Sequence, residues 1–345
     1  MASISPSTVS SLSRGAWLTD SHGRIIHDLR VSITDRCNYK CVYCRDGENS
    51  SHYPELGMDE YLRLIEAFVG LGISKVRLTG GEPLLRRDLP EMIRELAGMR
   101  TLDGGRLDLA LTTNGHLLED LAGPLKAAGL NRVTVSMDAV DAETFERITR
   151  VPGSFERVLR GVRAARAAGL TPLKINCVLL RGFNDSQIEG FARFARAEGV
   201  VARFIEFMPL EEGRLWSPEI VVPMREIVER IGRVLPLEEL EARDASETAR
   251  RFGFADGVGE IGIIAPVTQA FCGACSRVRL TSDGKIRTCL FSQIEHDLYG
   301  RLRAGVSQEE LRAYIARTVQ GKEARHHIGE PGFLKPSRSM VHIGG

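Results

Sequence analysis

From Asp28 onward the chain alternates short runs rich in β-branched residues with segments whose apolar residues recur at helical spacing. The pattern predicts strands at residues 29–34, 75–79, 108–112, 132–136, 173–178 and 202–207. Helices are predicted near residues 58–69, 118–128, 155–168, 187–196 and 224–231. Strands separated by helices need crossover connections, so the pattern favours a parallel sheet, either doubly wound or an incomplete β/α barrel.

Polar and cysteine-rich segments follow the ends of most of these strands. They are residues 37–44, 80–83, 113–115, the pair Ser136 and Asp138, and residues 208–209. The carboxyl ends of parallel strands meet at one face, where β/α proteins form their active sites. The sequence therefore predicts a single active site on that face of the sheet.

The densest of these segments contains three cysteines, Cys37, Cys41 and Cys44. This spacing allows the three sulfurs to face a common metal centre, but structural zinc requires four ligands and cubane iron–sulfur clusters usually have four thiolates. Three ligands would leave one iron open for a substrate or cofactor. Zinc with a fourth ligand from elsewhere in the chain is the alternative.

A second group of three cysteines, Cys272, Cys275 and Cys289, lies near the C-terminus. A zinc ribbon would need a second CxxC pair, which the chain lacks, although His296 could complete a zinc site. Two incomplete trios favour two clusters, each with one open iron. The remaining cysteine, Cys177, lies in a predicted strand and is expected to be a small buried apolar residue.

Composition narrows the class of protein. The chain has 345 residues, 43% hydrophobic and 26% charged, with a formal net charge of +1. Such a balance gives no global field for nucleic acid or membranes, and no apolar run reaches the ~18 residues of a membrane span. No GxxxxGK[ST] motif is present, which argues against a P-loop nucleotide hydrolase. Clustered cysteines that serve as metal ligands indicate a reducing compartment, so a cytoplasmic location is expected.

The sequence divides into four predicted regions. Residues 1–24 are expected to be a disordered tail, or an organellar transit peptide if that Ser/Thr-rich segment is a targeting signal. Residues 25–236 form the predicted barrel, 237–330 a smaller region with the second cysteine trio, and 331–345 a tail ending in Gly344-Gly345. The densely charged stretch 238–251 is predicted to be a linker or solvated surface segment.

The first trio, with Tyr43 just before its last cysteine, resembles the signature of the radical S-adenosylmethionine enzymes. In that family the open iron of a 4Fe-4S cluster is chelated by the amino and carboxylate groups of S-adenosylmethionine, and the reduced cluster cleaves it to a 5′-deoxyadenosyl radical. The resemblance implies an incomplete six-stranded parallel β/α barrel with a smaller C-terminal cluster-binding region.

The first trio together with residues 77–83, the second trio and the Gly-Gly end resembles more narrowly the GTP 3′,8-cyclase family. The resemblance implies two 4Fe-4S clusters and conversion of GTP to (8S)-3′,8-cyclo-7,8-dihydroguanosine 5′-triphosphate, the first step of molybdenum cofactor biosynthesis. Implied partners are a reduced electron donor and the cyclic pyranopterin monophosphate synthase that takes the product. A homodimer is compatible with the sequence, which does not determine the oligomeric state.

The same resemblance implies roles for individual residues. The S-adenosylmethionine contacts would be Tyr43, Gly81, Ser136 and Met208. The GTP contacts would be Arg30, Arg77, Thr112, Lys174, Arg277 and Arg279. The catalytic group would comprise Arg277, Arg279, Gly344 and Gly345, because the family's Gly-Gly end threads toward the active site.

Independent physical reasoning supports the basic residues of this set. Arg30, Arg77 and Lys174 lie within predicted strands, where charge is unexpected unless it points into the mouth of the barrel. Guanidinium and ammonium groups there could bind triphosphate oxygens. Two other classes stay open: a radical enzyme acting on a peptide or another small molecule, and a zinc-dependent binding module.

Overall fold

The computed structural model describes residues 17–44 and 53–344, and its centre is one strongly curved sheet. The 12-stranded sheet has the order β12-β11-β10-β1-β2-β3-β4-β5-β6-β9-β8-β7, and its strands are parallel from β10 through to β9. The first six strands are β1 (Asp28–Ser32), β2 (Lys75–Thr79), β3 (Asp108–Thr113), β4 (Arg132–Ser136), β5 (Lys174–Leu179) and β6 (Val201–Glu206).

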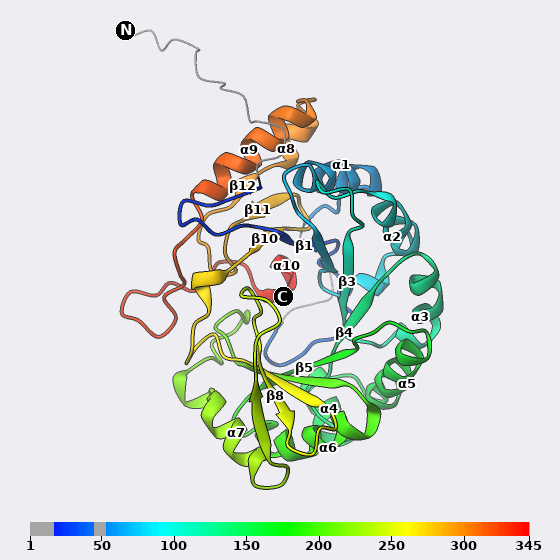
Figure 1. Cartoon of the computed structure of the whole chain (residues 1–345), viewed down its shortest axis with the longest axis vertical. Helices are drawn as coiled ribbons and strands as arrows, with labels where there is room; N and C mark the ends of the chain where they lie inside the picture. The colour runs from blue at the N-terminus through cyan, green and yellow to red at the C-terminus, as the bar shows by residue number, and fades with distance from the viewer. Residues whose placement is uncertain (1–16, 45–52, 345) are drawn as a thin grey trace.

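Helices cover the outside of the curved sheet, as Figure 1 shows, and the interior of the barrel is left to loops and the C-terminus. The covering helices are α1 (Met58–Val69), α2 (Leu89–Gly98), α3 (Leu118–Ala127), α4 (Ala142–Thr149), α5 (Ser154–Ala167), α6 (Ile188–Glu198) and α7 (Met224–Gly232). The main hydrophobic core lies between these helices and the sheet.

The pleat of the strands separates this core from a polar interior. In β1 the side chains of Leu29 and Val31 are fully buried in the core, and Arg30 between them points the other way. In β2 the same alternation buries Val76 and Leu78 and directs Arg77 inward. Apolar residues therefore hold the helices, while the basic residues of the same strands line the inside of the barrel.

The six predicted strands and the predicted helices are confirmed to within two residues at each end. Helices α2, α4 and α9 (Gln308–Gln320) were not predicted. The apolar residues of α2 do recur at helical spacing, whereas α4 is short and has few apolar positions, which gives a weak periodic signal.

The C-terminal region extends the sheet at both edges. β9 (Glu260–Ile264) pairs in parallel with β6, and β10 (Arg277–Leu280) pairs in parallel with β1. The predicted incomplete β/α barrel is confirmed, and these two strands continue it beyond the six predicted ones. β11 (Lys285–Arg287), β12 (His296–Asp297), α8 (Tyr299–Arg303) and α9 complete this side of the molecule, with α9 against α1.

Two sequence predictions are refined here. The charged stretch predicted as a linker or solvated surface segment does lie at the surface, but part of it forms β7 (Leu237–Leu240) and begins β8 (Arg250–Phe254), an antiparallel pair whose charged side chains mostly face solvent. Residues 17–24, predicted as part of a disordered tail, pack on the barrel, because Leu18 joins the core and Arg24 is buried. Residues 1–16 of that prediction lie outside the described residues.

A search of the described residues finds no helix with the length and apolarity needed to cross a membrane.

Candidate active site

A cavity of ≈ 300 Å³ opens inside the barrel, toward the carboxyl ends of the parallel strands. Both cysteine trios line it, so the two groups share one chamber. The other predicted site residues along its wall are Arg30, Tyr43, Arg77, Gly81, Thr112, Ser136, Met208, Arg277 and Arg279. Cys177 is fully buried in the core, outside this cavity, as predicted.

The first cysteine loop, which follows β1, is held in place by the end of α4 and by the residues just after β4. The backbone amides of Lys40 and Val42 donate to carbonyls at the end of α4. The Tyr43 hydroxyl donates to the Asp138 carboxylate at 2.6 Å, just beyond β4. Asp138 lies in the cavity wall, and burial raises its pKa to about 6. These anchors fix the direction in which the thiols of the loop face.

The loop after β2 is hydrogen-bonded to the residues just before the first cysteine. The amide of Gly81 donates to the Thr34 carbonyl at 2.8 Å, and the amide of Glu82 donates to the Arg36 carbonyl at 2.7 Å. A Cβ on Gly81 would lie 2.2 Å from the Arg36 carbonyl oxygen, so only glycine allows this approach. The buried Glu82 carboxylate accepts bonds from Thr113 and the Asn114 amide, and burial raises its pKa to about 7.

The second trio lies beside two basic residues. Cys272 and Cys275 are in a short loop before β10, and Cys289 follows β11. The Lys322 ammonium donates to the carbonyls of Arg277, at 3.0 Å, and Thr288. Burial alone would raise the pKa of the Cys275 thiol, but Arg277 and Lys322 next to it bring that pKa below its usual value. This setting favours a thiolate, the form that binds iron.

A row of basic side chains crosses the inner face of the sheet. In the register of the sheet, Arg30 stands between Arg279 on β10 and Arg77 on β2. The Arg77 guanidinium donates to the hydroxyls of Thr112 and Thr134, at 3.2 and 3.3 Å. The parallel strands thus place residues far apart in the sequence side by side.

Burial and mutual repulsion act on these cations. Burial, followed by the charge of Arg30, lowers the pKa of Arg77 to about 10. Burial and then Arg77 lower the pKa of Arg203, a further cation of the cavity wall, to about 9. An anionic ligand would oppose both effects, because a nearby opposite charge favours the protonated form.

Unsatisfied polar atoms lie in the same wall. Within the described part of the chain, Nε of Arg30, Nε of Arg203 and Oδ1 of Asn176 are buried and lack a hydrogen-bond partner. Buried donors and acceptors are normally paired, so the two Nε donors are suited to anionic oxygens of a ligand in the cavity, and the Asn176 oxygen is suited to a donor group of that ligand.

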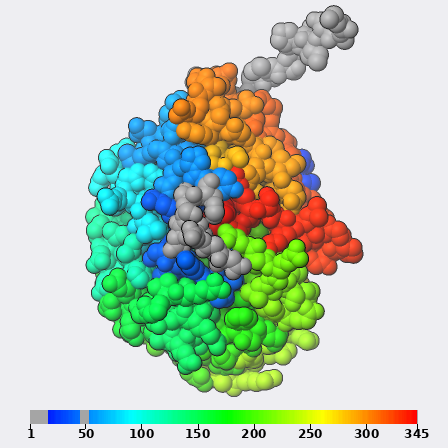
Figure 2. Space-filling view, turned by 180° about the vertical axis from the view of Figure 1, so that it is seen from behind, coloured from blue at the N-terminus to red at the C-terminus, as the bar shows by residue number. Residues whose placement is uncertain are grey.

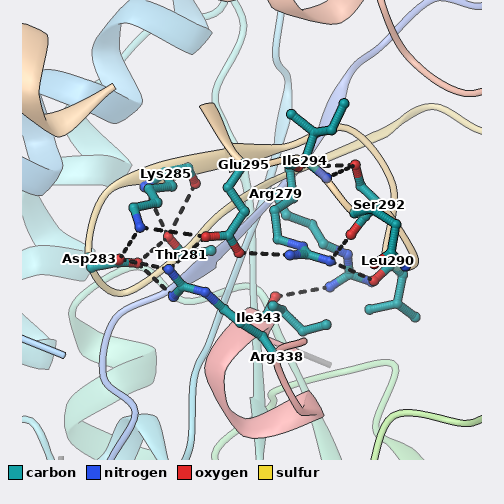
Figure 3. A network of polar contacts seen from close by, with 12 residues as sticks. Arg279, Thr281, Asp283, Lys285, Leu290, Ser292, Ile294, Glu295, Arg338 and Ile343 are labelled. Carbon is teal, nitrogen blue, oxygen red and sulfur yellow. Dashed lines mark hydrogen bonds and ion pairs between the residues drawn. The ribbon is translucent and has the colours of Figure 1, made fainter. Parts of the chain in front are cut away.

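Two predicted residues that the structure describes do not line the cavity wall. Lys174 lies at the start of β5, opposite Thr134 in the sheet register, where burial and then Arg203 lower its pKa to about 8. Gly344 is held next to the cavity by Arg279, which donates to its carbonyl oxygen. Arg279 also donates to the carbonyl oxygen of Ile343 at 3.4 Å (Figure 3). Gly345 lies outside the described residues.

Sequence reasoning missed several residues of the site. Arg203, like Arg30 and Arg77, is a charged residue inside an apolar strand, but it was not predicted as a site residue. Asn176 and Lys322 gave no such signal, because an amide in a strand and a lysine after a helix are both common on protein surfaces. Only the folded chain places them in the cavity wall.

The zinc alternatives require several ligand side chains to meet at one metal ion. Within residues 17–44 and 53–344, no group of three or more His, Cys, Asp or Glu side chains is close enough to hold a single metal ion. His296 is in β12 and is absent from the lining of the cavity.

Comparisons with known proteins identify the family. A family model described as the Radical SAM superfamily matches residues 31–195, and one described as Molybdenum Cofactor Synthesis C matches residues 200–328. The GTP 3′,8-cyclase of Moorella thermoacetica is 44% identical over 331 residues, which cover 95% of this chain and 100% of that protein. The chain belongs to the GTP 3′,8-cyclase family of radical S-adenosylmethionine enzymes.

Another member of the family agrees with this assignment, and a more distant structure shares the fold. The GTP 3′,8-cyclase of Peptoclostridium acidaminophilum is 41% identical and covers 95% of this chain and 98% of its own. A crystal structure of Streptococcus suis SuiB bound to S-adenosylmethionine has a TM-score of 0.59 at 14% identity, covering 92% of this chain and 78% of that chain. At this identity the structural likeness shows the fold alone.

Proposed function

We propose that this protein is a GTP 3′,8-cyclase, which converts GTP to (8S)-3′,8-cyclo-7,8-dihydroguanosine 5′-triphosphate in the first step of molybdenum cofactor biosynthesis. One observation carries the proposal: two cysteine trios and a row of inward arginines line one cavity, in a chain similar over nearly its whole length to curated GTP 3′,8-cyclases. A single chamber is what a reaction between two bound small molecules requires.

Each trio would hold one 4Fe-4S cluster and leave an iron open. We assign Cys37, Cys41 and Cys44 to the cluster that binds S-adenosylmethionine, with contacts from Tyr43, Gly81, Ser136 and Met208. We assign Cys272, Cys275 and Cys289, within the region 237–330, to an auxiliary cluster facing GTP. When bound and reduced by an electron donor, the first cluster and S-adenosylmethionine supply the radical that abstracts hydrogen from the ribose.

The chain's own contribution is to bind and orient the substrate. Arg30, Arg77 and Arg203 point inward with unpaired or weakly paired guanidinium groups, a setting suited to triphosphate oxygens. Lys174 and Thr112 extend the same surface, which supports their predicted role in GTP binding. Burial of the site keeps water from the reacting atoms.

Arg277 and Arg279 would act at the other side of the substrate, near the second trio. The Arg277 guanidinium lies 3.3 Å from the Cys275 sulfur, and Arg279 contacts the C-terminal segment. We propose that this segment, with its Gly344-Gly345 end, closes the cavity over bound GTP. The product would pass to a cyclic pyranopterin monophosphate synthase.

The proposal is tested with protein purified and reconstituted without oxygen. Two 4Fe-4S clusters correspond to about eight irons per chain. Incubation with GTP, S-adenosylmethionine and a strong reductant should give the 3′,8-cyclised product by mass spectrometry, and ATP in place of GTP should give none. A protein that holds zinc, or that cleaves S-adenosylmethionine without ever modifying GTP, would contradict the proposal.

A further inference from the structure

The C-terminal segment runs from the surface into the cavity. Met340 and Val341 of the short helix α10 (Met340–Ile343) line the cavity wall. At Gly344, φ is +69° and an added Cβ would lie 2.6 Å from the side chain of Thr79. An isolated helix of one turn has no stability of its own, so something outside α10 must hold this segment in place. Figure 2 shows the C-terminal residues, in red, between the orange C-terminal region and the green half of the barrel.

Arg338 joins this segment to two carboxylates (Figure 3). Its guanidinium donates two bonds to the Asp283 carboxylate, at 2.9 and 2.8 Å, and lies 2.7 Å from a carboxylate oxygen of Glu295. Its side chain is only 5% exposed, against 9% for Asp283. A two-bond contact between guanidinium and carboxylate fixes direction as well as distance.

The carboxylates that receive Arg338 belong to a rigid part of the molecule. Asp283 lies in the turn between β10 and β11 and accepts a second bond from the Thr281 hydroxyl at 2.6 Å. Glu295 accepts from Arg287 at 2.7 Å, and Arg287 is almost fully buried. Arg338 is therefore tied to the hairpin that includes β10, the strand of Arg279.

The same segment also contacts the part of the chain that follows the first cysteine loop. The Arg338 guanidinium lies 4.1 Å from the centre of the Tyr53 ring, and the Tyr53 amide donates to Asp35 at 3.0 Å. Asp35 is two residues before Cys37. Arg338 thus connects the region of the second trio with the region of the first.

We infer that Arg338 is a positioning residue, which seats the C-terminal segment so that Gly344 is held against Arg279 inside the cavity. The inference rests on the proposed function, because it assigns a task to the segment that closes the GTP site. Arg279 of β10 holds the far end of the segment, and Asp283 of the same hairpin holds its near end through Arg338. Loss of Arg338 would let the segment leave the cavity while both cysteine trios stay in place.

The test compares Arg338→Met and Arg338→Lys with Arg325→Met as the matched control. Arg325 is also a C-terminal arginine with one carboxylate partner, but its side chain is 58% exposed. In Arg338→Met we expect kcat to fall about 10²-fold, as misplacement by about 1 Å can cause, with KM for GTP little changed. The lysine variant keeps the charge without the two-bond geometry and should recover part of the loss.

Two further readouts separate positioning from a general structural role. Hydrogen exchange of the peptide 335–344 should become faster in Arg338→Met. The thermal midpoint of unfolding should fall, because a buried ion pair is lost, while the iron content stays close to that of the control. Unchanged exchange and unchanged kcat in both Arg338 variants would overturn the inference, as would a loss of iron that accounts for the whole loss of activity. Failure of the wild-type protein to cyclise GTP would instead refute the proposed function, and exchange would still report on the segment.

Discussion

At the scale of single residues, the site is formed by arginine side chains within strands that are otherwise mostly apolar. Arg30, Arg77 and Arg203 each alternate with buried apolar neighbours, so the pleat that buries those neighbours turns the guanidinium groups inward. A buried cation is unfavourable unless it meets an anion, so these residues are adapted to a ligand more than to stability.

Replacement of Arg203 tests the residue that the sequence did not reveal. Hydrogen bonds to charged groups contribute about 1.5–3 kcal/mol, so Arg203→Met should raise KM for GTP roughly 10- to 100-fold, measured by initial rates. Arg196→Met is the control, because Arg196 forms an exposed ion pair with Asp256 on the outside of the barrel. Equal KM values in the two variants would exclude Arg203 from GTP binding.

Lys174 predicts a pH dependence. Its pKa is lowered to about 8, first by burial and then by Arg203, so the free enzyme loses this positive charge as the pH rises through 8. We expect kcat/KM for GTP to fall above pH 8, because that ratio reports ionisations of the free enzyme. Lys174→Met should have a lower kcat/KM without this alkaline decline, and a decline that persists in the variant would show that another group titrates.

At the scale of elements, the loops depend on contacts with their neighbours more than on their own conformational preferences. The cysteine loop after β1 is bound to the loop after β2, to α4 and to the end of β4. The loop of the second trio is bound to the N-terminal residues 17–24. Each loop is thus fixed by chain segments remote from its cysteines.

Gly81→Ala tests the contact between the loop after β2 and the first cysteine loop. The new Cβ would meet the Arg36 carbonyl at 2.2 Å and displace the cysteine loop, since backbone cannot move aside as a flexible side chain can. Overpacking costs about 1–3 kcal/mol, and we expect the variant to lose the iron of the first cluster, seen as a drop to about half the wild-type iron content. Gly98→Ala, where an added Cβ meets nothing within 4 Å, should keep all of its iron.

Replacement of Arg24 is the equivalent test for the loop of the second cysteine trio. It is paired with Asp20 at 2.6 Å and donates to the carbonyls of Cys272 and Ala324 at 2.9 Å and Glu323 at 2.6 Å. Breaking such a buried pair costs about 3–5 kcal/mol, so Arg24→Met should lower the thermal midpoint and lose the iron of the second cluster.

The contrast for Arg24→Met is Arg243→Met, because Arg243 is 54% exposed and its partner Glu260 keeps Arg251 as a second partner. A surface ion pair contributes about 0–1 kcal/mol, so this variant should match the wild-type protein in iron content and thermal midpoint. An Arg24→Met protein with full iron would show that residues 17–24 do not position the second loop.

At the scale of the whole molecule, the C-terminal region extends the open barrel at both edges. Its strands β9 and β10 join the two edges of the six-stranded sheet in parallel, and its last residues enter the interior (Figure 1). This arrangement brings the second trio to the first across one cavity, although the two are more than two hundred residues apart in the chain.

Removal of Gly344 and Gly345 tests whether the end of the chain belongs to the active site. Both trios keep their supporting contacts without these two residues, so iron content should equal that of the wild-type protein. Formation of the cyclised product should be abolished, measured by mass spectrometry after anaerobic incubation. Full turnover by the truncated protein would mean that the Gly-Gly end has no part in catalysis.

The sequence by itself determined the six strands and their helices, because hydrophobic periodicity is strong in long amphipathic segments such as α1 and α5. It also predicted two cysteine trios, each suited to hold a metal cluster. Short elements such as β9 and α4 escaped prediction, since a few apolar residues do not distinguish a strand or helix from a loop.

Only the tertiary structure decided which residues meet. The register of parallel strands places Arg279, Arg30 and Arg77 in one row, and no local pattern contains that information, because register depends on pairing between distant segments. Likewise, nothing in the sequence around Arg338 indicates a buried residue, because its contact with Asp283 forms only in the folded chain. The sequence determined the chemistry available to this protein, and the packing of its sheet decided where that chemistry comes together.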